Sequence, residues 1–198
     1  MIAEGPSANR PPHIALEPAL RFSLSLITAV FLALAASGCD RGEQPDSQAT
    51  AQPTGTIVGR ASAGELLPPI TVRQGDGTTL ALPALAGRPV LINLWATWCA
   101  PCVVEMPMLD ELAQDGLRVV TISQDLTGAE AVAPFFAARD FQAIEPWLDP
   151  DMALTDHYDG GNLPMSIYYD AEGREVWRVI GDLDWTGENA AELLGEAD

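Results

Sequence analysis

From residue 58 onward, continuous apolar runs alternate with segments in which apolar positions recur every three or four residues. Residues 89–95 and 117–123 are apolar and β-branched runs, and they predict two buried strands. Residues 103–114 lie between them with apolar positions at helical spacing, which predicts a helix packed on the sheet. Because strand, helix and strand follow one another, we expect the two strands to pair in parallel through a right-handed crossover.

Shorter apolar segments extend this unit in both directions. Residues 70–72 and 79–82 flank a glycine-containing turn and predict a β-hairpin in front of the main unit. Residues 166–169 and 175–180 predict a second hairpin. Further helices are expected at 129–139, 152–157 and 187–194. The fold class is therefore α/β, with a central mixed sheet flanked by helices and an added N-terminal β-hairpin, over residues 58–198.

The first part of the chain has a different pattern. Residues 22–37 are an unbroken run of apolar and small residues preceded by Arg21, which matches the apolar core of a secretory signal. The run leads into Ala36-Ser37-Gly38-Cys39, which resembles the lipobox of bacterial lipoproteins, so Cys39 is the expected lipidation site. We expect residues 1–38 to be a lipoprotein-type signal peptide; a short uncleaved anchor and a soluble cleaved form are the alternatives.

Residues 39–57 separate this signal from the domain. Between Asp40 and Thr56 there is no large apolar residue, so the segment cannot bury enough surface to fold, and we expect a flexible tether. Its reach is roughly 20 to 25 Å for about seventeen residues. An aspartate directly after a lipidated cysteine resembles the residue that keeps lipoproteins on the inner membrane of some bacteria. We therefore expect the domain to be lipid-anchored at the periplasmic side of a bacterial inner membrane.

Composition and charge exclude several classes of function. The ten basic residues are all arginines, so a P-loop lysine, a Schiff-base lysine and a lysine general base are absent. The formal net charge of −18 argues against nucleic acid as a partner, because the phosphate backbone would be repelled.

Candidate metal ligands are few. His157 is the only histidine beyond the first 38 residues, which is too few for a Cys/His zinc site, and we expect it at the surface. One acidic group lacks the spacing of a calcium loop and is expected to be a solvated surface; its members are Asp149, Asp151, Asp156 and Asp159. We therefore expect neither a metal nor another cofactor.

Cys99 and Cys102 carry the most informative chemistry. They lie two residues apart at the junction of a predicted strand and a predicted helix, where two sulfurs can store a pair of electrons as a disulfide. The positive end of the helix dipole favours a thiolate at Cys99, which is the expected nucleophile. Cys102, one turn further in, is the expected resolving thiol and the more buried of the two. Ala100 and Pro101 keep the loop between them tight, and Pro101 suits the start of a helix.

Three segments resemble the active site of a known family. They are Asn93-Leu94-Trp95-Ala96-Thr97-Trp98-Cys99-Ala100-Pro101-Cys102, Glu105-Met106-Pro107, and Leu163-Pro164 before a predicted strand. On these residues the chain is identified as a member of the thioredoxin-like superfamily, of the TlpA/ResA type of membrane-anchored thiol-disulfide oxidoreductase. The resemblance implies a thioredoxin fold, a cis peptide before Pro164, and a loop of Leu163 and Pro164 that offers backbone groups to a substrate peptide. Met165 stands where the family more often has threonine.

The exchange reaction also needs a proton acceptor for Cys102. A buried carboxylate with a raised pKa serves this purpose, and many thioredoxins carry one on the strand where this chain has Asn93. Glu105, three residues after Cys102 and on the same side of the helix, is the candidate instead, and a solvated glutamate without a role is the alternative. Trp98 is expected to shield the sulfurs and to form part of the docking surface. The other tryptophans are expected to pack in the interior: Trp95, Trp147, Trp177 and Trp185.

The expected function is that of a thiol-disulfide oxidoreductase. Ala-Pro between the cysteines is closer to the Gly-Pro of the family's reducing members, which favours the reduction of protein disulfides. The resemblance implies a membrane thiol electron donor, with apocytochrome c or copper-site assembly proteins as substrates and hence a role in cytochrome c biogenesis. Two alternatives stay open: a non-catalytic copper carrier or assembly module of the same fold, and a thiol peroxidase, whose Pro-x-x-x-Thr-x-x-Cys setting is missing.

Overall fold

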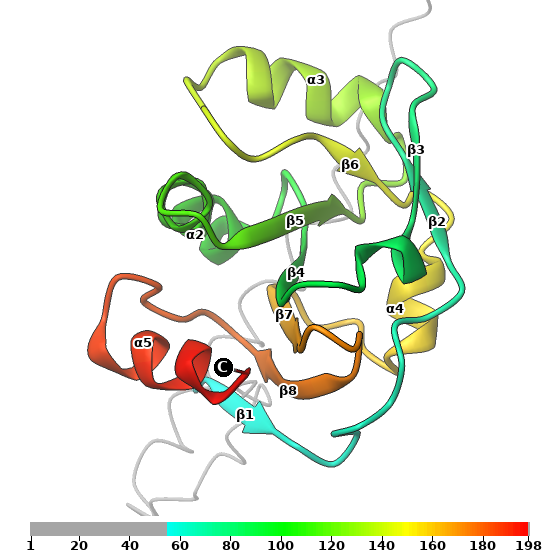
Figure 1. Ribbon diagram of the computed structural model, residues 1–198. Helices are drawn as coiled ribbons and strands as arrows, with labels where there is room; N and C mark the ends of the chain where they lie inside the picture. Colours follow the sequence, from blue (N-terminus) through cyan, green and yellow to red (C-terminus); the bar gives the residue numbers. More distant parts are fainter. Residues whose placement is uncertain (1–54, 198) are drawn as a thin grey trace, which may run out of the picture. The chain divides into compact units, whose positions relative to one another are not determined.

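The computed structural model describes residues 55–197 as a mixed sheet with helices on both faces (Figure 1). The strands are β1 (Ile57–Gly59), β2 (Thr71–Arg73), β3 (Thr79–Ala81), β4 (Val90–Trp95), β5 (Arg118–Ser123), β6 (Trp147–Leu148), β7 (Met165–Tyr169) and β8 (Glu175–Ile180). The helices are α2 (Ala100–Gln114), α3 (Ala129–Ala137), α4 (Ala153–His157) and α5 (Glu188–Leu194), with 3-10 turns η2 (Leu82–Leu85) and η3 (Gly195–Ala197). The predicted α/β class and central mixed sheet are confirmed.

The centre of the sheet is parallel. The strand order is β1-β8-β7-β4-β5-β6-β2-β3, and β4, β5 and β6 run in the same direction. The predicted parallel pairing of β4 with β5 is confirmed, with Trp95 opposite Ser123 at their carboxyl ends. Because these ends meet at one edge, the loops that follow β4 and β5 lie side by side there. This edge carries the cysteine pair.

Both predicted hairpins are present. β7 pairs with β8, and β2 pairs with β3 with Val72 opposite Leu80. The β2–β3 hairpin joins β6 through Arg73 opposite Leu148, so it extends the sheet on the side opposite β1. Neither β1 nor β6 was expected from the sequence, because segments of three and two residues are too short to show an alternating pattern and, unlike β2 and β3, they do not flank a hairpin turn.

The helices divide between the two faces of β4, whose six residues are all buried. On one face Leu91 belongs to a cluster that includes Leu109 of α2 and Leu193 of α5, and α3 covers the same face near β6. On the other face Ile92 belongs to a cluster that includes Leu82 of η2 and Leu154 of α4. Burial on both faces explains why the strand reads as a continuous apolar run rather than an alternating one.

Two local expectations are corrected by the structure. α2 begins at Ala100, three residues before the expected start, because the first turn of a helix needs no apolar periodicity. Asp149 is not a solvated surface residue: it is buried, and its carboxylate accepts hydrogen bonds from the backbone N–H groups of Ala153 and Leu154 at 3.1 and 2.8 Å. It therefore satisfies free N–H groups at the start of α4. The other members of that acidic group, and His157, are exposed as expected.

Predictions for the first part of the chain fall outside the described residues. These are the signal peptide at 1–38, the lipidation of Cys39, and all but the end of the tether at 39–57. At that end, β1 begins at Ile57, one residue before the expected domain boundary. Within residues 55–197, none of the helices has the length and apolarity needed to cross a bilayer.

Candidate functional site

Cys99 and Cys102 form a disulfide at the N-terminus of α2, with their Cα atoms 5.3 Å apart. Cys99 is the N-cap residue, and its Sγ accepts a hydrogen bond from the backbone N–H of Cys102 at 3.3 Å. Cys102 is 1% exposed and Cys99 is 6% exposed, so the expected order of burial is confirmed. The unpaired N–H groups of this helix end favour a thiolate at Cys99 after reduction.

The residues around Cys99 present an apolar surface to solvent. The Trp98 side chain is 68% exposed, and Ala100 and Pro101 are exposed as well. Val104, one turn after Pro101, is also 68% exposed. Exposed aromatic and aliphatic groups beside a reactive sulfur are suited to contact with a polypeptide.

The loop before β7 packs against the buried cluster that contains the disulfide. The Leu163–Pro164 peptide bond is cis, which confirms the expectation drawn from the family resemblance. Leu163 packs against the cluster of buried residues that contains both cysteines, and Pro164 is buried. The carbonyl oxygen of Pro164 accepts a hydrogen bond from the N–H of Gly181 at 3.0 Å, which ties this loop to the segment after β8.

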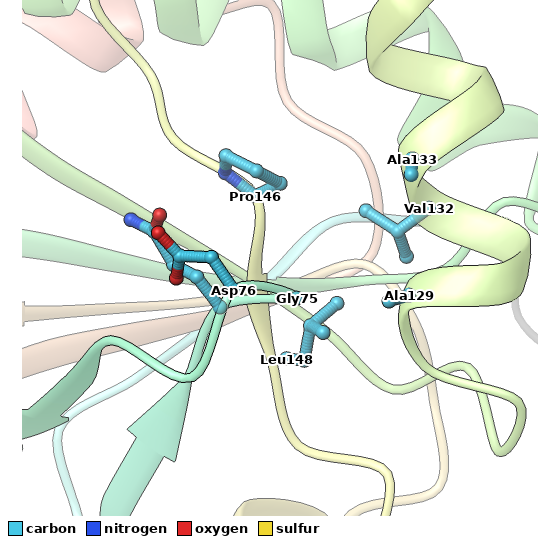
Figure 2. Close-up of a pocket in the computed structure, with 8 residues that line it drawn as sticks. Gly75, Asp76, Ala129, Val132, Ala133, Pro146 and Leu148 are labelled. Atoms are coloured by element: carbon cyan, nitrogen blue, oxygen red, sulfur yellow. The ribbon is translucent and has the colours of Figure 1, made fainter.

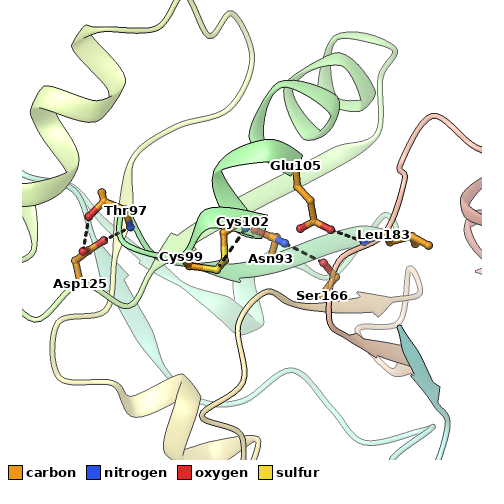
Figure 3. The surroundings of a disulfide bond; sticks show 8 residues. All are labelled: Asn93, Thr97, Cys99, Cys102, Glu105, Asp125, Ser166 and Leu183. Atoms are coloured by element: carbon orange, nitrogen blue, oxygen red, sulfur yellow. Dashed lines mark hydrogen bonds between the residues drawn. A yellow bond between two sulfur atoms is a disulfide. The ribbon is translucent and has the colours of Figure 1, made fainter. Parts of the chain in front are cut away.

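Glu105 is a buried carboxylate rather than a solvated one. It is 2% exposed, and its Oε1 accepts a hydrogen bond from the backbone N–H of Leu183 at 2.7 Å (Figure 3). Burial raises the pKa of Glu105 to about 7, because the loss of hydration outweighs the opposing effect of that hydrogen bond. Oε2 has no hydrogen-bond partner within residues 55–197.

Two further polar side chains lie near the Glu105 carboxyl. Asn93 donates to Ser166 Oγ at 2.9 Å, and Trp185 is buried, with no acceptor among the described residues for its Nε1–H. Both side chains are close enough to lower the pKa of Glu105, whereas the charge of Asp182 raises it. Trp185 was expected only to pack in the interior; it does so, but it also borders the carboxyl group. No sequence motif could have indicated this proximity.

A hollow of about 250 Å³ reaches Glu105 from the surface. It is lined by Pro101, Val104, Glu105, Met108, Asp182, Leu183 and Asp184. Glu105 is buried, whereas Asp182 and Asp184 at the rim are exposed. The hollow therefore lies between Glu105 and solvent.

On the other side of the disulfide, Asp125 binds the loop that precedes Cys99 (Figure 3). The Asp125 carboxylate accepts hydrogen bonds from both the N–H and the hydroxyl of Thr97, at 2.9 and 2.7 Å. Sequence reasoning did not single out Asp125. An aspartate two residues after the end of a predicted strand was the available signal, since polar residues at the carboxyl ends of parallel strands commonly belong to sites.

A second hollow, of about 340 Å³, lies between α3 and the β2–β3 hairpin (Figure 2). Its apolar lining includes Val132, Pro146 and Leu148, and neither cysteine nor Glu105 borders it. Within residues 55–197 no group of three or more potential ligand side chains is placed to hold a metal ion. The reactive groups of the described domain are thus gathered at the disulfide.

Comparisons with known proteins agree with this geometry. The Redoxin family model matches residues 62–194. Thiol-disulfide oxidoreductase ResA of Bacillus cereus is 31% identical over 123 residues, which are 60% of this chain and 70% of that protein. The exposed lipoprotein thioredoxin Etrx1 of Streptococcus pneumoniae is 25% identical with a TM-score of 0.54, covering 64% of this chain and 98% of that one. A thio-disulfide isomerase of Thermus thermophilus is 26% identical with a TM-score of 0.55, covering 69% and 98%.

Proposed function

The chain belongs to the Redoxin family and is a protein-disulfide oxidoreductase of thioredoxin fold and TlpA/ResA type, and we propose that it works as a reductase of protein disulfides through Cys99 and Cys102. One observation carries the proposal. The two sulfurs are bonded at a helix N-terminus, beside an exposed apolar surface and one turn from a buried carboxyl group with a pKa of about 7.

The reaction runs in two exchanges. In the reduced protein, the Cys99 thiolate attacks a substrate disulfide; a Cys99–substrate disulfide forms and one substrate thiolate leaves. The Cys102 thiolate then attacks Cys99 Sγ, which releases the second substrate thiolate and restores the Cys99–Cys102 disulfide. Two electrons pass from the cysteine pair to the substrate. A thiol electron donor at the membrane must then reduce the pair again.

Glu105 is the proposed proton acceptor for Cys102. Cys102 is a thiol in an apolar setting, so it needs a base before it can attack the mixed disulfide. Glu105 lies three residues along the same helix, and a pKa near 7 suits both acceptance and release of a proton at neutral pH. The hollow beside it supplies the exchange with water.

The substrate is proposed to dock on the surface formed by Trp98, Ala100 and Pro101 and on the loop of Leu163 and Pro164. Support comes from the exposure of the first three residues and from the packing of Leu163 against the buried cluster that contains both cysteines. Trp98 has the largest exposed apolar side chain beside the disulfide, so it is the proposed anchor.

The proposed location is the periplasmic side of a bacterial inner membrane, with a lipid on Cys39 and a tether at 39–57. Support comes from the apolar run and lipobox-like segment in the sequence, and from the similarity to a protein described as an exposed lipoprotein. Apocytochrome c and copper-site assembly proteins are the proposed substrates.

The lipid anchor is tested by replacement of Cys39 by serine, which should abolish palmitate incorporation and release the protein from the membrane fraction. Unchanged lipid labelling would refute the anchor.

Insulin reduction with dithiothreitol as the electron source tests the activity itself. The wild-type protein should accelerate precipitation of the insulin B chain, whereas Cys99→Ser should not. Cys102→Ser should accumulate mixed disulfides through Cys99, and mass spectrometry of those adducts from native envelopes would identify the substrates. Equal rates for the wild type and Cys99→Ser would refute the enzymatic function.

A further inference from the structure

The segment between β4 and α2 is held from outside by Asp125. The backbone N–H of Thr97 donates to Asp125 Oδ2 at 2.9 Å, and the Thr97 hydroxyl donates to Oδ1 at 2.7 Å. Each carboxylate oxygen thus serves a different donor of the same residue. Thr97 lies two residues before Cys99, and Figure 3 shows this pair on the side of the disulfide opposite Glu105.

Asp125 is itself fixed. It is 4% exposed, and Ser123 Oγ donates to its Oδ2 at 2.8 Å while accepting from the Asp125 N–H at 3.0 Å. None of the ion pairs in residues 55–197 includes Asp125. A buried carboxylate without a cation depends on its hydrogen-bond donors, and hydrogen bonds to a charged group are stronger than neutral ones. The two hydrogen bonds from Thr97 to Asp125 are therefore stronger than two hydrogen bonds to a neutral acceptor.

This contact begins where the sheet stops holding the chain. The ladder between β4 and β5 ends with Trp95 opposite Ser123, followed by a last hydrogen bond from Gln124 N–H to the Trp95 carbonyl at 2.8 Å. After that point the segment 96–98 leaves the sheet and turns, with the Cys99 N–H donating to the Ala96 carbonyl at 3.1 Å. Over this turn, the hydrogen bonds that Asp125 accepts from Thr97 hold the chain in place of the hydrogen bonds between the strands.

In the oxidised protein the disulfide also ties Cys99 to α2. Reduction removes that covalent link, and the position of Cys99 then depends on non-covalent contacts. The stabilisation of a thiolate by a helix N-terminus falls off within the first turn, so a small displacement of Cys99 weakens it. A contact that holds the preceding segment therefore matters more in the reduced protein than in the oxidised one.

We propose that Asp125 is a positioning residue of the redox site: by binding both donors of Thr97, it keeps Cys99 at the N-cap of α2 and Trp98 at the surface when the disulfide is open. The proposal rests on the proposed function, in which the Cys99 thiolate is the nucleophile. Asp125 acts on the sulfurs only through the segment 96–98.

The test is the rate at which iodoacetamide alkylates Cys99 in the reduced full-length protein across pH 4 to 9. Asp125→Asn leaves one carbonyl oxygen for three donors, the Thr97 N–H and the hydroxyls of Thr97 and Ser123, so the hold on Thr97 weakens and the pKa of the Cys99 thiol should rise toward that of an ordinary cysteine. If the pKa of Cys99 is higher by one, the thiolate fraction at any pH below the pKa is about tenfold smaller, and alkylation is about tenfold slower. Thr97→Val, which keeps only the N–H donor, should show a smaller decrease in the same direction. Thr97→Ser keeps both donors and should react as the wild type does.

Asp149→Asn is the matched control, because Asp149 is also buried and also accepts backbone N–H groups, but at the start of α4. It should lower the melting temperature without changing alkylation of Cys99. If Asp125→Asn folds poorly, the comparison of Thr97→Val with Thr97→Ser decides the matter. Wild-type alkylation profiles in Asp125→Asn and Thr97→Val would overturn the positioning role. Insulin reduction by Cys99→Ser would instead overturn the proposed function, so the two failures are distinguishable.

Discussion

Glu105 on α2 and Leu183, 78 residues later, are joined by a hydrogen bond of 2.7 Å from the Leu183 N–H to Glu105 Oε1. This bond fastens the segment after β8 to the helix that begins with the cysteines. It also leaves the second carboxylate oxygen unpaired among the described residues, in a buried setting that raises the pKa of Glu105 to about 7. The same side chain thus closes the site structurally and is available to bind a proton at neutral pH.

Replacing Glu105 by glutamine should separate these two roles. Glutamine still offers an oxygen to Leu183 but does not titrate. We expect the release of substrate from the mixed disulfide to slow by about tenfold or more at pH 7, because a general base contributes at least that much, and the inflection near pH 7 should vanish. Stopped-flow measurement of thiol release from a preformed mixed disulfide between pH 5 and 9 tests this. Glu111→Gln, an exposed position on the same helix, should match the wild type.

We also expect Glu105→Gln to change the unfolding free energy in a pH-dependent way. Because the pKa of Glu105 is raised in the folded protein, the folded state binds a proton that the unfolded state releases between about pH 4.5 and 7. The contribution of this group to stability is therefore full below pH 4.5 and is lost as the pH rises through 7. Glu105→Gln should be more stable than the wild type at pH 8 by up to about 3 kcal/mol, and similar at pH 4. Urea unfolding of both oxidised proteins at the two pH values measures the difference; equal stabilities at pH 8 would contradict it.

For Asp110 we expect stability to depend on pH in the opposite direction. Burial acts to raise its pKa, but the backbone N–H groups of Ala143, Gln142 and Ile144 lower it more, so the net pKa lies below the ordinary value. Its contribution to stability is present above the unfolded pKa of 3.8 and is lost as the pH falls through the lower folded pKa.

Asp110→Asn should accordingly lose about 2 kcal/mol of unfolding free energy at pH 7, because hydrogen bonds to a charged acceptor become neutral ones. The difference from the wild type should shrink as the pH falls below the unfolded pKa of 3.8. Denaturant titrations at pH 7 and 3 measure both values. Asp115→Asn, at an exposed aspartate just past the end of the same helix, is the control. An undiminished difference at low pH would show that the charge of Asp110 is not the cause.

Trp98→Ala should affect recognition rather than folding. Its side chain is 68% exposed, so its removal should change unfolding free energy by less than about 0.5 kcal/mol. We expect kcat/KM for reduction of insulin to fall about tenfold, within the range for loss of an exposed aromatic anchor. Reduction of a small disulfide such as 5,5′-dithiobis(2-nitrobenzoic acid) should stay near the wild-type rate, since it lacks a docking segment.

Leu66→Ala is the control for Trp98→Ala, because it removes a comparably exposed apolar side chain outside the site and should leave both rates unchanged. Equal losses for insulin and the small disulfide would place Trp98 in the chemistry rather than in docking.

The pattern of apolar and polar residues predicted most of the strands, helices and turns that carry the site. β4 is buried over all six residues and β5 over its last four, so both leave an apolar run in the sequence that could be found without knowledge of their neighbours. β6 has two residues and exists only because β5 and β2 lie on either side of it. Asp149 reads as one of several acids along the chain, and only the approach of α4 makes it a buried acceptor.

By itself, the sequence determined the reactive pair, its place at the start of a helix, and the family resemblance, because these depend on residues close together along the chain. The sequence also offered Glu105 as a candidate carboxylate, but tertiary structure alone decided that its carboxyl group is buried and that Asp125 binds the loop before Cys99. Glu105 is buried by Leu183 and Trp185 from beyond β8, and Asp125 reaches Thr97 from the end of a neighbouring strand. Desolvation and hydrogen bonding act through space, so the pKa of Glu105 and the partners of Asp125 are set by contacts that chain order does not contain.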